Sequence, residues 1–357
     1  SISSNPSASR TRTVCIFQKT INRSAPQDFS FRFWQVAVSA FSCTVFFPAE
    51  HSPAFVYFLM IASLSGKRLV IFGCGYVGSA VALQAREYGM RVTALTRNTA
   101  SAHVLREQDI EAVVADLADD SWHGEIAGGA DFALNCVSSG GGAAESYRRS
   151  YLQGMISIVK WAEGRGAPST LVYTSSTSVY PQGEGALVDE SAPTPRVEVS
   201  ERAKILLEAE DCLRTSGNPI AWRWFILRLA GIYGPGRHHF VDQVRAGKVH
   251  GTPDAHLNLI HRDDIASAIW ACFLAPPELR NEIFNGVDNA PAKKAEIVAW
   301  LARLLEVPGT CFTGEPISGR RGLTPDRIIS NQKLRSRLGW QPRYPSFREG
   351  CANFLSP

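Results

Sequence analysis

The 357-residue sequence predicts an α/β protein: a doubly wound parallel sheet with helices on both faces, and a smaller, interleaved substrate-binding region toward the C-terminus. Three observations support this prediction. Short apolar runs alternate with longer helical patterns from residue 67 onward, as in a parallel sheet with crossover helices. A glycine-rich turn directly follows the first apolar run. The last third of the chain has shorter elements separated by glycine and proline.

The first strand is expected at residues 68–72, and three glycines follow it with the spacing G-x-G-x-x-G. Gly73 would turn the chain tightly, Gly75 would let backbone amides approach a pyrophosphate, and Gly78 would let the next helix pack close to the strand. That helix begins with residues 79–85, and its N-terminus would attract the phosphates. The motif in this context predicts a Rossmann-type dinucleotide site. Its cofactor-binding residues are Gly73, Gly75, Tyr76, Val77 and Gly78.

The remaining strands and helices follow in alternation. Each strand is a short run rich in aliphatic and β-branched residues. In chain order the strands are R-V-T-A-L at 91–95, A-V-V-A at 112–115, F-A-L-N-C-V at 132–137, T-L-V-Y-T at 170–174 and a longer run at 221–229. The helices are expected at 151–162, where the chain crosses back over the sheet, at 201–215 and at 292–305.

The end of the second strand indicates which dinucleotide binds. NAD-specific sites usually place Asp or Glu there to bond the ribose 2′-hydroxyl, whereas Arg can accommodate a 2′-phosphate. Thr96 and Arg97 occupy this position, with no acidic residue. The sequence therefore predicts NADP in preference to NAD, with Arg97 as a cofactor-binding residue. The alternative is that Arg97 is a solvated surface charge.

Composition and charge argue against several classes of function. Charged residues make up 20% of the chain and hydrophobic residues 45%, as in an ordinary globular protein. A net charge of +4 without a basic–aromatic patch argues against nucleic-acid binding. Eight cysteines are spread without C-x-x-C or metal-ligand spacing, which favours reduced thiols in the cytoplasm and no metal site. For Cys74, inside the glycine motif, a redox role is the less favoured alternative.

Residues 1–65 are expected to form a leader outside the fold. Residues 1–59 are rich in Ser and Arg and poor in acidic residues, which is compatible with an organelle transit segment; the favoured alternative is that translation starts at Met60. No apolar run there is long enough for a clean membrane span, so no membrane association is expected. The rest divides into an NAD(P)-binding domain at 66–235 and a smaller substrate-binding region at 236–357.

Residues 175–180, S-S-T-S-V-Y, follow the fifth strand. Together with the glycine motif they resemble the extended short-chain dehydrogenase/reductases, the NAD-dependent epimerase/dehydratase family. The other matching segments are D-L at 116–117, R-L-A-G-I-Y-G-P-G at 228–236, L-I-H-R-D-D-I at 259–265, and N-Q-K-L with L-G-W-Q-P at 331–342. The resemblance covers about residues 67–355. It adds Asp116 and Leu117, as the family's adenine-side pair, to the cofactor-binding residues.

The resemblance implies a reaction centre of four residues: a Tyr and a Lys spaced Y-x-x-x-K, a Ser or Thr, and a helix Asn. In that family the lysine contacts the nicotinamide ribose and lowers the tyrosine pKa, so that the phenolate takes a proton during hydride transfer. Two positions match here, Ser176 and Lys204. The tyrosine position is Ser200, and the asparagine position is Tyr151. The run around Ser200 resembles an atypical branch of the superfamily, the bacterial YeeZ-like proteins.

Ser200 is a poor substitute for a catalytic tyrosine, because its hydroxyl is a much weaker acid and its side chain is shorter. The catalytic residues are therefore expected to be Ser176, which would polarise the substrate oxygen, and Lys204, which would hold the nicotinamide ribose. Tyr151 is the candidate for proton transfer, since its phenol would project from the crossover helix toward the same cleft. A half-buried packing role is the alternative for Tyr151.

Two functions are compatible with these residues. The first is an NAD(P)-dependent oxidoreductase, epimerase or dehydratase acting on a small sugar-like or otherwise polar substrate, with Arg237 and His238 as substrate-binding candidates. The second is a protein that binds or senses NADP(H) without catalysis, because Ser200 occupies the tyrosine position. The presence of Ser176 and Lys204 favours the first. The expected partner is thus a small molecule, and the family resemblance also allows a homodimer.

Overall fold

The structure is a computed structural model that describes residues 61–126, 128–140, 144–165, 168–216, 222–307, 309–315 and 325–355. All of these residues belong to one compact unit, Pro53–Pro357. The expected leader therefore lies outside the described residues, except for residues 61–65. Within that short stretch Leu64 is buried in the main core.

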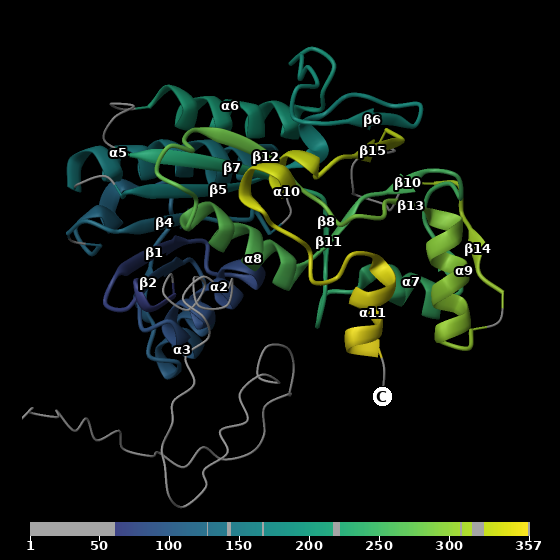
Figure 1. The fold of residues 1–357 in the computed structure, drawn as a ribbon, viewed down its shortest axis with the longest axis horizontal. Coiled ribbons are helices and arrows are strands. Elements are labelled where there is room, and N and C mark those ends of the chain that lie inside the picture. Colours follow the sequence, from purple (N-terminus) through teal and green to yellow (C-terminus); the bar gives the residue numbers. More distant parts are fainter. Residues whose placement is uncertain are drawn as a thin grey trace, which may run out of the picture. The chain divides into compact units, whose positions relative to one another are not determined.

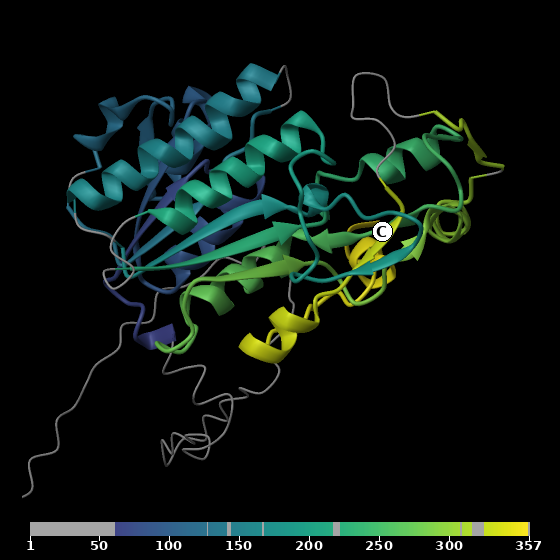
Figure 2. The same cartoon turned by 90° about the horizontal axis from the view of Figure 1, so that it is seen from above.

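A seven-stranded parallel sheet forms the centre of the fold (Figure 2). Its strands lie in the order β12-β7-β5-β4-β1-β2-β3. They are β1 (Arg68–Phe72), β2 (Arg91–Thr96), β3 (Glu111–Val114), β4 (Phe132–Asn135), β5 (Thr170–Ser176), β7 (Arg223–Leu229) and β12 (Glu282–Gly286). The chain adds β2 and β3 on one side of β1, and then returns to add β4 on the other. This order confirms the predicted doubly wound parallel sheet.

Helices cover both faces of the sheet (Figure 1). α2 (Tyr76–Glu87), α3 (Thr99–Glu107) and α8 (Arg262–Phe273) contribute to the core on one face, and α5 (Gly154–Arg165) and much of α6 (Glu201–Thr215) to that on the other. On β1, Leu69 and Ile71 belong to the first buried cluster, whereas Val70 and Phe72 belong to the second. Because both sides of this strand are buried, its sequence is continuously apolar instead of alternating.

The crossover between β4 and β5 begins before residues 151–162, where the helix was predicted. α4 (Ala144–Arg148), a π-helical segment (Arg149–Gln153) and α5 follow one another directly. The predicted start at Tyr151 therefore falls inside the helical stretch, within its π-helical part. By contrast, α6 has the predicted limits, because Ser200 caps it: its Oγ accepts a hydrogen bond from the Ala203 amide at 3.3 Å.

β6 and much of the chain after β7 build a second group of short elements, on the right in Figure 1. Its strand pairs are β8–β11, β6–β15, β9–β14 and β10–β13, of which the last is antiparallel. The strands are β6 (Ala186–Val188), β8 (Gly231–Tyr233), β9 (Lys248–Val249), β10 (His256–Leu257), β11 (Leu259–His261), β13 (Ala292–Lys293), β14 (Cys311–Phe312) and β15 (Arg327–Ile329). The helices are α7 (His239–Arg245), α9 (Lys294–Leu304) and α11 (Phe347–Leu355). α10 (Gln332–Leu338) lies instead beside β12, and its Leu334 is buried in the main core (Figure 1).

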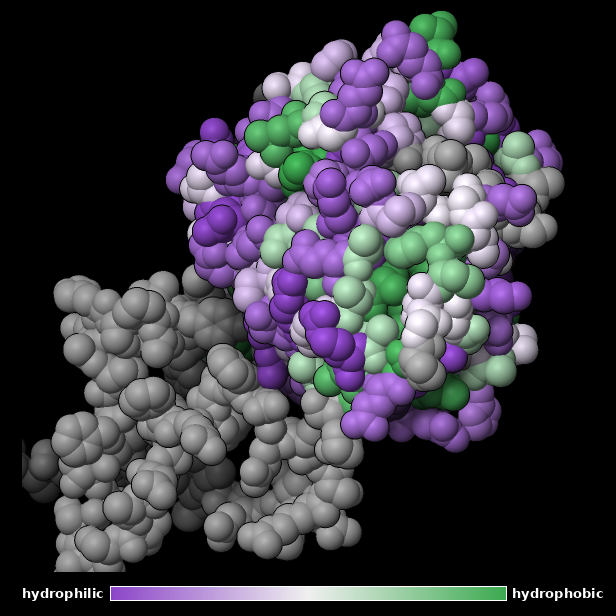
Figure 3. All heavy atoms as spheres, turned by 90° about the vertical axis from the view of Figure 1, so that its right-hand side faces the viewer, coloured by the Kyte–Doolittle hydropathy of each residue, from purple (hydrophilic) through white to green (hydrophobic). Residues whose placement is uncertain are grey.

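This second group has a core of its own, in which Val244 of α7, Ile297 of α9 and Phe347 of α11 are buried together. Figure 3 views the molecule from this end, where hydrophobic residues gather in a patch bordered by hydrophilic ones. β12 departs from this grouping: it lies within the expected substrate-binding region of the sequence, yet it pairs with β7 in the central sheet. Among the described helices, none is both long and apolar enough to cross a membrane.

Two buried aspartates help to join these parts. Asp264, in the first turn of α8, accepts hydrogen bonds from the amides of Arg343 at 2.6 Å and Tyr344 at 3.1 Å. Asp288 accepts one from the Ala290 amide at 3.1 Å through Oδ1, while its Oδ2 has no partner among the residues that the structure describes. Burial raises the pKa of Asp264 to about 6. Burial, together with the nearby charge of Asp264, raises the pKa of Asp288 to about 7.

Asp288→Asn is expected to stabilise the fold near pH 8 by about 2–4 kcal/mol. A carboxyl group with a raised pKa in the folded state binds its proton more tightly there than in the unfolded chain. Its contribution to stability is present below the unfolded pKa of about 4 and is lost as the pH rises through about 7. Asparagine keeps the acceptor for Ala290 and does not ionise.

Urea unfolding near pH 5 and near pH 8 measures how the free energy of unfolding depends on the ionisation of Asp288. The wild type should lose stability between the two conditions, and Asp288→Asn should lose much less. Asp254→Asn, at an exposed position, is the control that should behave as the wild type. Equal losses in the wild type and Asp288→Asn would show that Asp288 does not carry the pH dependence.

Candidate functional site

A cleft of about 1300 Å³ opens at the carboxyl ends of β1, β4 and β5. The strand order reverses between β1 and β4, and open sheets of this kind bind their ligands at this switch point. The lining residues come from the glycine motif and the ends of β2 and β5, and also from α7 and β10. The volume exceeds the roughly 300–1,000 Å³ of a pocket for one drug-sized ligand. A dinucleotide and a second molecule could therefore share it.

The three glycines of the motif have different structural roles. Gly73 has φ +83°, and a Cβ built on it would lie 2.4 Å from the Cα of Val137. Gly78 is packed so closely that an added Cβ would lie 2.8 Å from the Sγ of Cys136. Gly75 is exposed in the cleft, and an added Cβ would meet only the Gly73 carbonyl, at 4.0 Å. The fold therefore needs glycine at 73 and 78, whereas Gly75 leaves space for a ligand at the N-terminus of α2.

The other expected cofactor residues are spread along the cleft. The predicted residues that line it are Gly73, Gly75, Tyr76, Val77, Arg97, Asp116 and Leu117, and Gly78 packs outside the lining. Asp116 accepts hydrogen bonds from Arg149 Nε at 2.9 Å and from the Ala118 amide at 3.0 Å. Burial raises the pKa of Asp116, but these bonds outweigh it and hold the pKa below its usual value. Arg97 is exposed, and its Nη2 donates to the Ser138 carbonyl at 3.4 Å.

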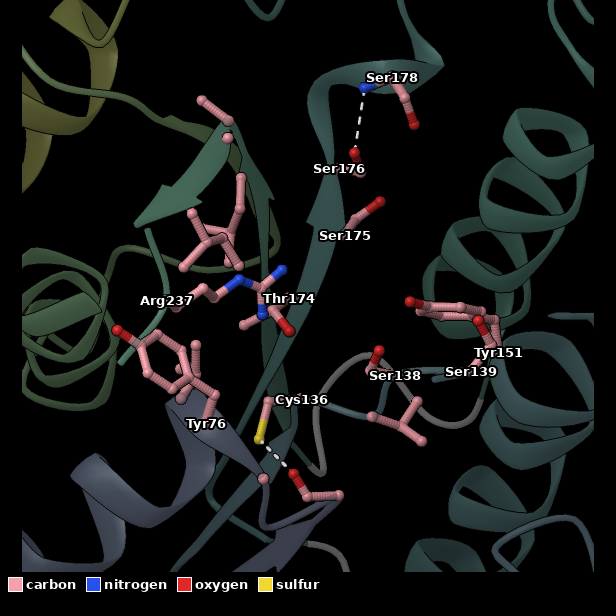
Figure 4. A pocket seen from close by; sticks show the side chains of 18 of the residues that line it. Tyr76, Cys136, Ser138, Ser139, Tyr151, Thr174, Ser175, Ser176, Ser178 and Arg237 are labelled. Atoms are coloured by element: carbon pink, nitrogen blue, oxygen red, sulfur yellow. Dashed lines mark hydrogen bonds between the residues drawn. The ribbon is translucent and has the colours of Figure 1, made fainter. Parts of the chain in front are cut away.

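Hydroxyl side chains line the middle of the cleft (Figure 4). They are Ser138, Ser139, Thr174, Ser175, Ser176, Thr177 and Ser178. Ser175 donates a hydrogen bond to Glu210 Oε1 at 2.6 Å. Ser176 Oγ instead accepts one from the Ser178 amide at 3.2 Å, and no acceptor for its own hydrogen is present among the described residues. The hydroxyl hydrogen of Ser176 is therefore available to a ligand in the cleft.

Tyr151 reaches the same part of the cleft from the crossover helix (Figure 4). It lies in the π-helical segment, an irregularity that often occurs at functional sites. Its ring packs on Tyr147 with the centroids 4.4 Å apart, and the Arg202 guanidinium lies 5.6 Å from the Tyr147 ring. Arg202 also lines the cleft. The cleft thus brings Ser176, Tyr151 and a guanidinium together.

Ser200 and Lys204 are not among the residues that line the cleft, and the role expected of Lys204 remains a prediction. Ser200 is exposed and caps α6, while Lys204 Nζ pairs with Glu201 Oε2 at 3.5 Å. Their spacing puts them on one side of the helix, but a different side faces the cleft. That side carries Arg202, which is rotated from Lys204 by about 200° because each helical residue turns by about 100°. Arg202 is the cation that the sequence analysis missed.

The two substrate-binding candidates lie in different places. Arg237 lines the cleft, with its guanidinium 5.5 Å from the Tyr76 ring. His238 does not line it, because its Nδ1 lies 3.0 Å from Asp242 Oδ1 and its ring stacks on Phe354. The lining residues from the C-terminal elements that were not predicted include Phe240, Gln243, His250, His256, Asn258, Lys294 and Arg327.

The cysteines at the glycine motif are protonated thiols. Burial raises the pKa of Cys74 to about 12, whereas a reactive thiol needs a lowered pKa. Burial also raises the pKa of Cys136, whose Sγ donates a hydrogen bond to the Gly73 carbonyl at 3.2 Å. These environments do not favour the redox alternative for Cys74.

A doubly wound parallel sheet with a G-x-G-x-x-G motif at its switch point defines a Rossmann-type dinucleotide-binding protein. More particularly, residues 69–285 match the model of the NAD dependent epimerase/dehydratase family, and the chain belongs to this family. The resemblance seen in the sequence is thereby confirmed.

Two relatives illustrate where the chain lies within this family. It is 29% identical to protein YeeZ of Escherichia coli K12 over 287 residues, which cover 78% of this chain and 97% of YeeZ. It is 26% identical to a 3-diazoavenalumate denitrifying reductase from Streptomyces over 217 residues, 56% of this chain and 68% of the reductase. The likeness to YeeZ agrees with the predicted YeeZ-like branch.

Solved structures share the fold at low sequence identity. An epimerase from Methanothermobacter thermautotrophicus has a TM-score of 0.68 at 18% identity, over 85% of this chain and 95% of the epimerase. The UDP-glucuronic acid 4-epimerase from Bacillus cereus, in complex with UDP-glucuronic acid and NAD, has a TM-score of 0.67 at 16% identity, over 81% and 98% of the two chains. Both similarities confirm the fold class.

Proposed function

We propose that this protein binds NADP(H) and transfers hydride to or from a small polar substrate, as an oxidoreductase, epimerase or dehydratase. The observation that carries the proposal is the continuity of the cleft. It extends from Gly75, past Ser176 and Tyr151, to side chains of the C-terminal elements. A dinucleotide on the glycine motif would leave its reactive end beside those hydroxyls, with space beyond for a substrate. The reductase and epimerases to which the chain is similar support this class of reaction.

The residues of the cleft fit such a dinucleotide. Gly75 leaves room for the pyrophosphate at the N-terminus of α2, where the helix dipole favours an anion. Asp116 and Leu117 would hold the adenosine side. Arg97 would bind the 2′-phosphate of NADP, since its guanidinium is exposed in the cleft and the end of β2 has no acidic residue to favour NAD.

When bound, the nicotinamide supplies or accepts the hydride. Ser176 would donate its hydroxyl hydrogen to the substrate oxygen, and Tyr151 would release or take up the proton. An unperturbed tyrosine has a pKa of about 10, so its phenolate needs positive charge nearby. Arg202, next to the Tyr147 ring on which Tyr151 packs, is the closest such charge in the cleft that the contacts identify. We therefore propose that Arg202, in place of Lys204, supplies the positive charge that stabilises the phenolate.

NADP(H) binding without catalysis is the second candidate, and one observation favours it. The hydroxyl of Ser200 is used as a helix cap and Lys204 pairs with Glu201, so this Y-x-x-x-K position supplies no catalytic pair to the cleft. NADPH consumption with a panel of carbonyl substrates, together with product analysis of sugars incubated with the protein and NADP, distinguishes the two candidates. An oxidoreductase oxidises NADPH with at least one substrate. An epimerase or dehydratase returns the hydride and converts a sugar without net consumption of NADPH. A sensor only binds the dinucleotide and converts nothing.

Two further expectations remain proposals. We propose a reducing compartment such as the cytoplasm, because the six cysteines within the described ranges are free thiols. A homodimer is expected from the family resemblance, and analytical ultracentrifugation of the full chain would test it.

Titration of the full chain with NADPH and NADH tests the proposed cofactor. We expect tighter binding of NADPH, and we expect Arg97→Ala to weaken NADPH binding by about tenfold or more while changing NADH binding little, because only NADPH carries the 2′-phosphate. Arg86→Ala, which removes a partly exposed arginine outside the cleft, is the control. Failure to bind either dinucleotide would overturn the proposed function. Equal effects of Arg97→Ala on both would overturn the preference for NADP alone.

A further inference from the structure

Lys294 lines the cleft on the side of the C-terminal elements. It is the first residue of α9, which Figure 1 shows at the right-hand end of the described unit, away from α2. Its ammonium group lies against the backbone of Gly251, so closely that a Cβ built there would be 2.4 Å from Lys294 Nζ. Gly251 also has φ +87°, a conformation that favours glycine. A glycine at position 251 therefore leaves the space that the ammonium group of Lys294 occupies.

The position of Lys294 is electrostatically unfavourable in three respects. Its side chain is half-buried, and the loss of solvation lowers its pKa. It stands at a helix N-terminus, where the helix dipole already places positive charge. Within the described ranges it has no carboxylate partner, because the acidic residue of the same helical turn, Glu296, pairs with Arg348. A half-buried charge without a counter-ion destabilises the fold locally, and such unfavourable features are typical of functional sites.

None of the described charged residues that line the cleft near Lys294 provides a negative charge for its ammonium group. His250, the chain neighbour of Gly251, also lines the cleft and is a basic side chain. His256 already has a partner, since its Nδ1 lies 2.9 Å from Asp326 Oδ1. Of the described residues that line the cleft, Asp116 is the single carboxylate, and it is bound to an arginine on the adenosine side. Among the described residues, those that line the cleft around Lys294 therefore include basic side chains and no acidic one.

We propose that Lys294 binds an anionic group of the second ligand of this cleft, a carboxylate or a phosphate. That this second ligand is a substrate rests on the proposed function. The ammonium of Lys294 would be the main charge partner, with His250, the chain neighbour of Gly251, as an additional donor. An ion pair in a partly desolvated cleft is stronger than one at the surface, so the anion would offset the cost of burying the amine. It would also orient the substrate, with its uncharged reacting end toward Ser176.

Competitive labelling of the full chain tests the inference without knowledge of the substrate. The rate at which an amine-reactive reagent modifies Lys294 is measured by peptide mapping in chloride, acetate or phosphate at constant ionic strength. Lys293, the exposed neighbour outside the cleft lining, is the internal control. We expect acetate or phosphate to slow the modification of Lys294 by about threefold or more relative to chloride, with little effect on Lys293. Protection by one anion and not the other would identify the chemistry of the group.

Equal rates at Lys294 in all three salts, or equal protection of both lysines, would overturn the inference. A matched pair of variants provides a second test with gluconate, glucose 6-phosphate and glucose as probes. The wild type should bind one of the two anionic probes. Lys294→Met should weaken binding of that probe by about tenfold, whereas Lys293→Met should leave it unchanged. An equal effect of the two variants would also overturn it. Labelling is done without dinucleotide, so its outcome is independent of whether NADP(H) binds and of the proposed function.

Discussion

Gly75→Val is expected to weaken binding of NADPH by about 100-fold or more, which corresponds to about 2.7 kcal/mol. The valine side chain would project into the space where the pyrophosphate approaches the N-terminus of α2. The fold should tolerate it, because a Cβ at this position meets only the Gly73 carbonyl, at 4.0 Å. Fluorescence or calorimetric titration measures the binding, and thermal unfolding without ligand measures the stability.

Gly73→Ala is the contrasting variant. Gly73 has φ +83°, and a Cβ there would lie 2.4 Å from the Cα of Val137, a backbone atom that cannot move aside easily. This substitution should therefore lower the free energy of unfolding by several kcal/mol, whatever it does to binding. If Gly75→Val bound NADPH as the wild type does, the dinucleotide could not lie on this motif as proposed.

Glu210→Ala is expected to destabilise the fold by about 3–5 kcal/mol. Glu210 and Arg228 are both buried, with Arg228 Nη2 2.6 Å from Glu210 Oε2 and Arg228 Nε 3.1 Å from Oε1. Ser175 donates a third hydrogen bond to Glu210 Oε1. Removing the carboxylate would leave the Arg228 guanidinium buried and unpaired, resting on the Tyr180 ring. The loss of stability should appear in the urea midpoint.

Two controls separate this effect from a simple loss of charge. Glu208→Ala removes another glutamate of α6, one that is partly exposed and pairs with Arg148 at 2.7 Å. Its cost should be about 1 kcal/mol or less, because solvent screens such pairs. The double variant Glu210→Met with Arg228→Met should be less destabilised than Glu210→Ala, since no buried charge is left alone. If Glu210→Ala lowered the free energy of unfolding no more than Glu208→Ala does, the buried ion pair of Glu210 and Arg228 would not be the main contribution to the stability of this region.

The fold could be predicted largely because its signals are local. The apolar run at β1 and the cap at Ser200 each act within a few residues, so β1 and α6 have the limits that the sequence indicated. β12 was missed because its place in the sheet depends on its pairing with β7, more than fifty positions earlier in the chain. The π-helical segment at Tyr151 was missed because no residue type marks the extra backbone position.

The site could be predicted only in part, for a related reason. The glycine motif has a fixed spacing, and the structure places its members where the roles of Gly73, Gly75 and Gly78 require. The side of α6 that faces the cleft depends on how the helix is rotated against its neighbours, which decides between Lys204 and Arg202. Lys294 carries no motif, since it becomes part of the site only when α9 packs against distant loops.

The position of β12 also has a consequence for the biosynthesis of the protein. The edge of β7 that β12 covers remains uncovered by β12 until residues 282–286 have emerged from the ribosome, after the glycine motif and α6 have emerged. Unpaired strand edges are aggregation-prone in partly folded chains. Translation of the C-terminal region therefore supplies both the wall of the cleft and the last strand of the central sheet.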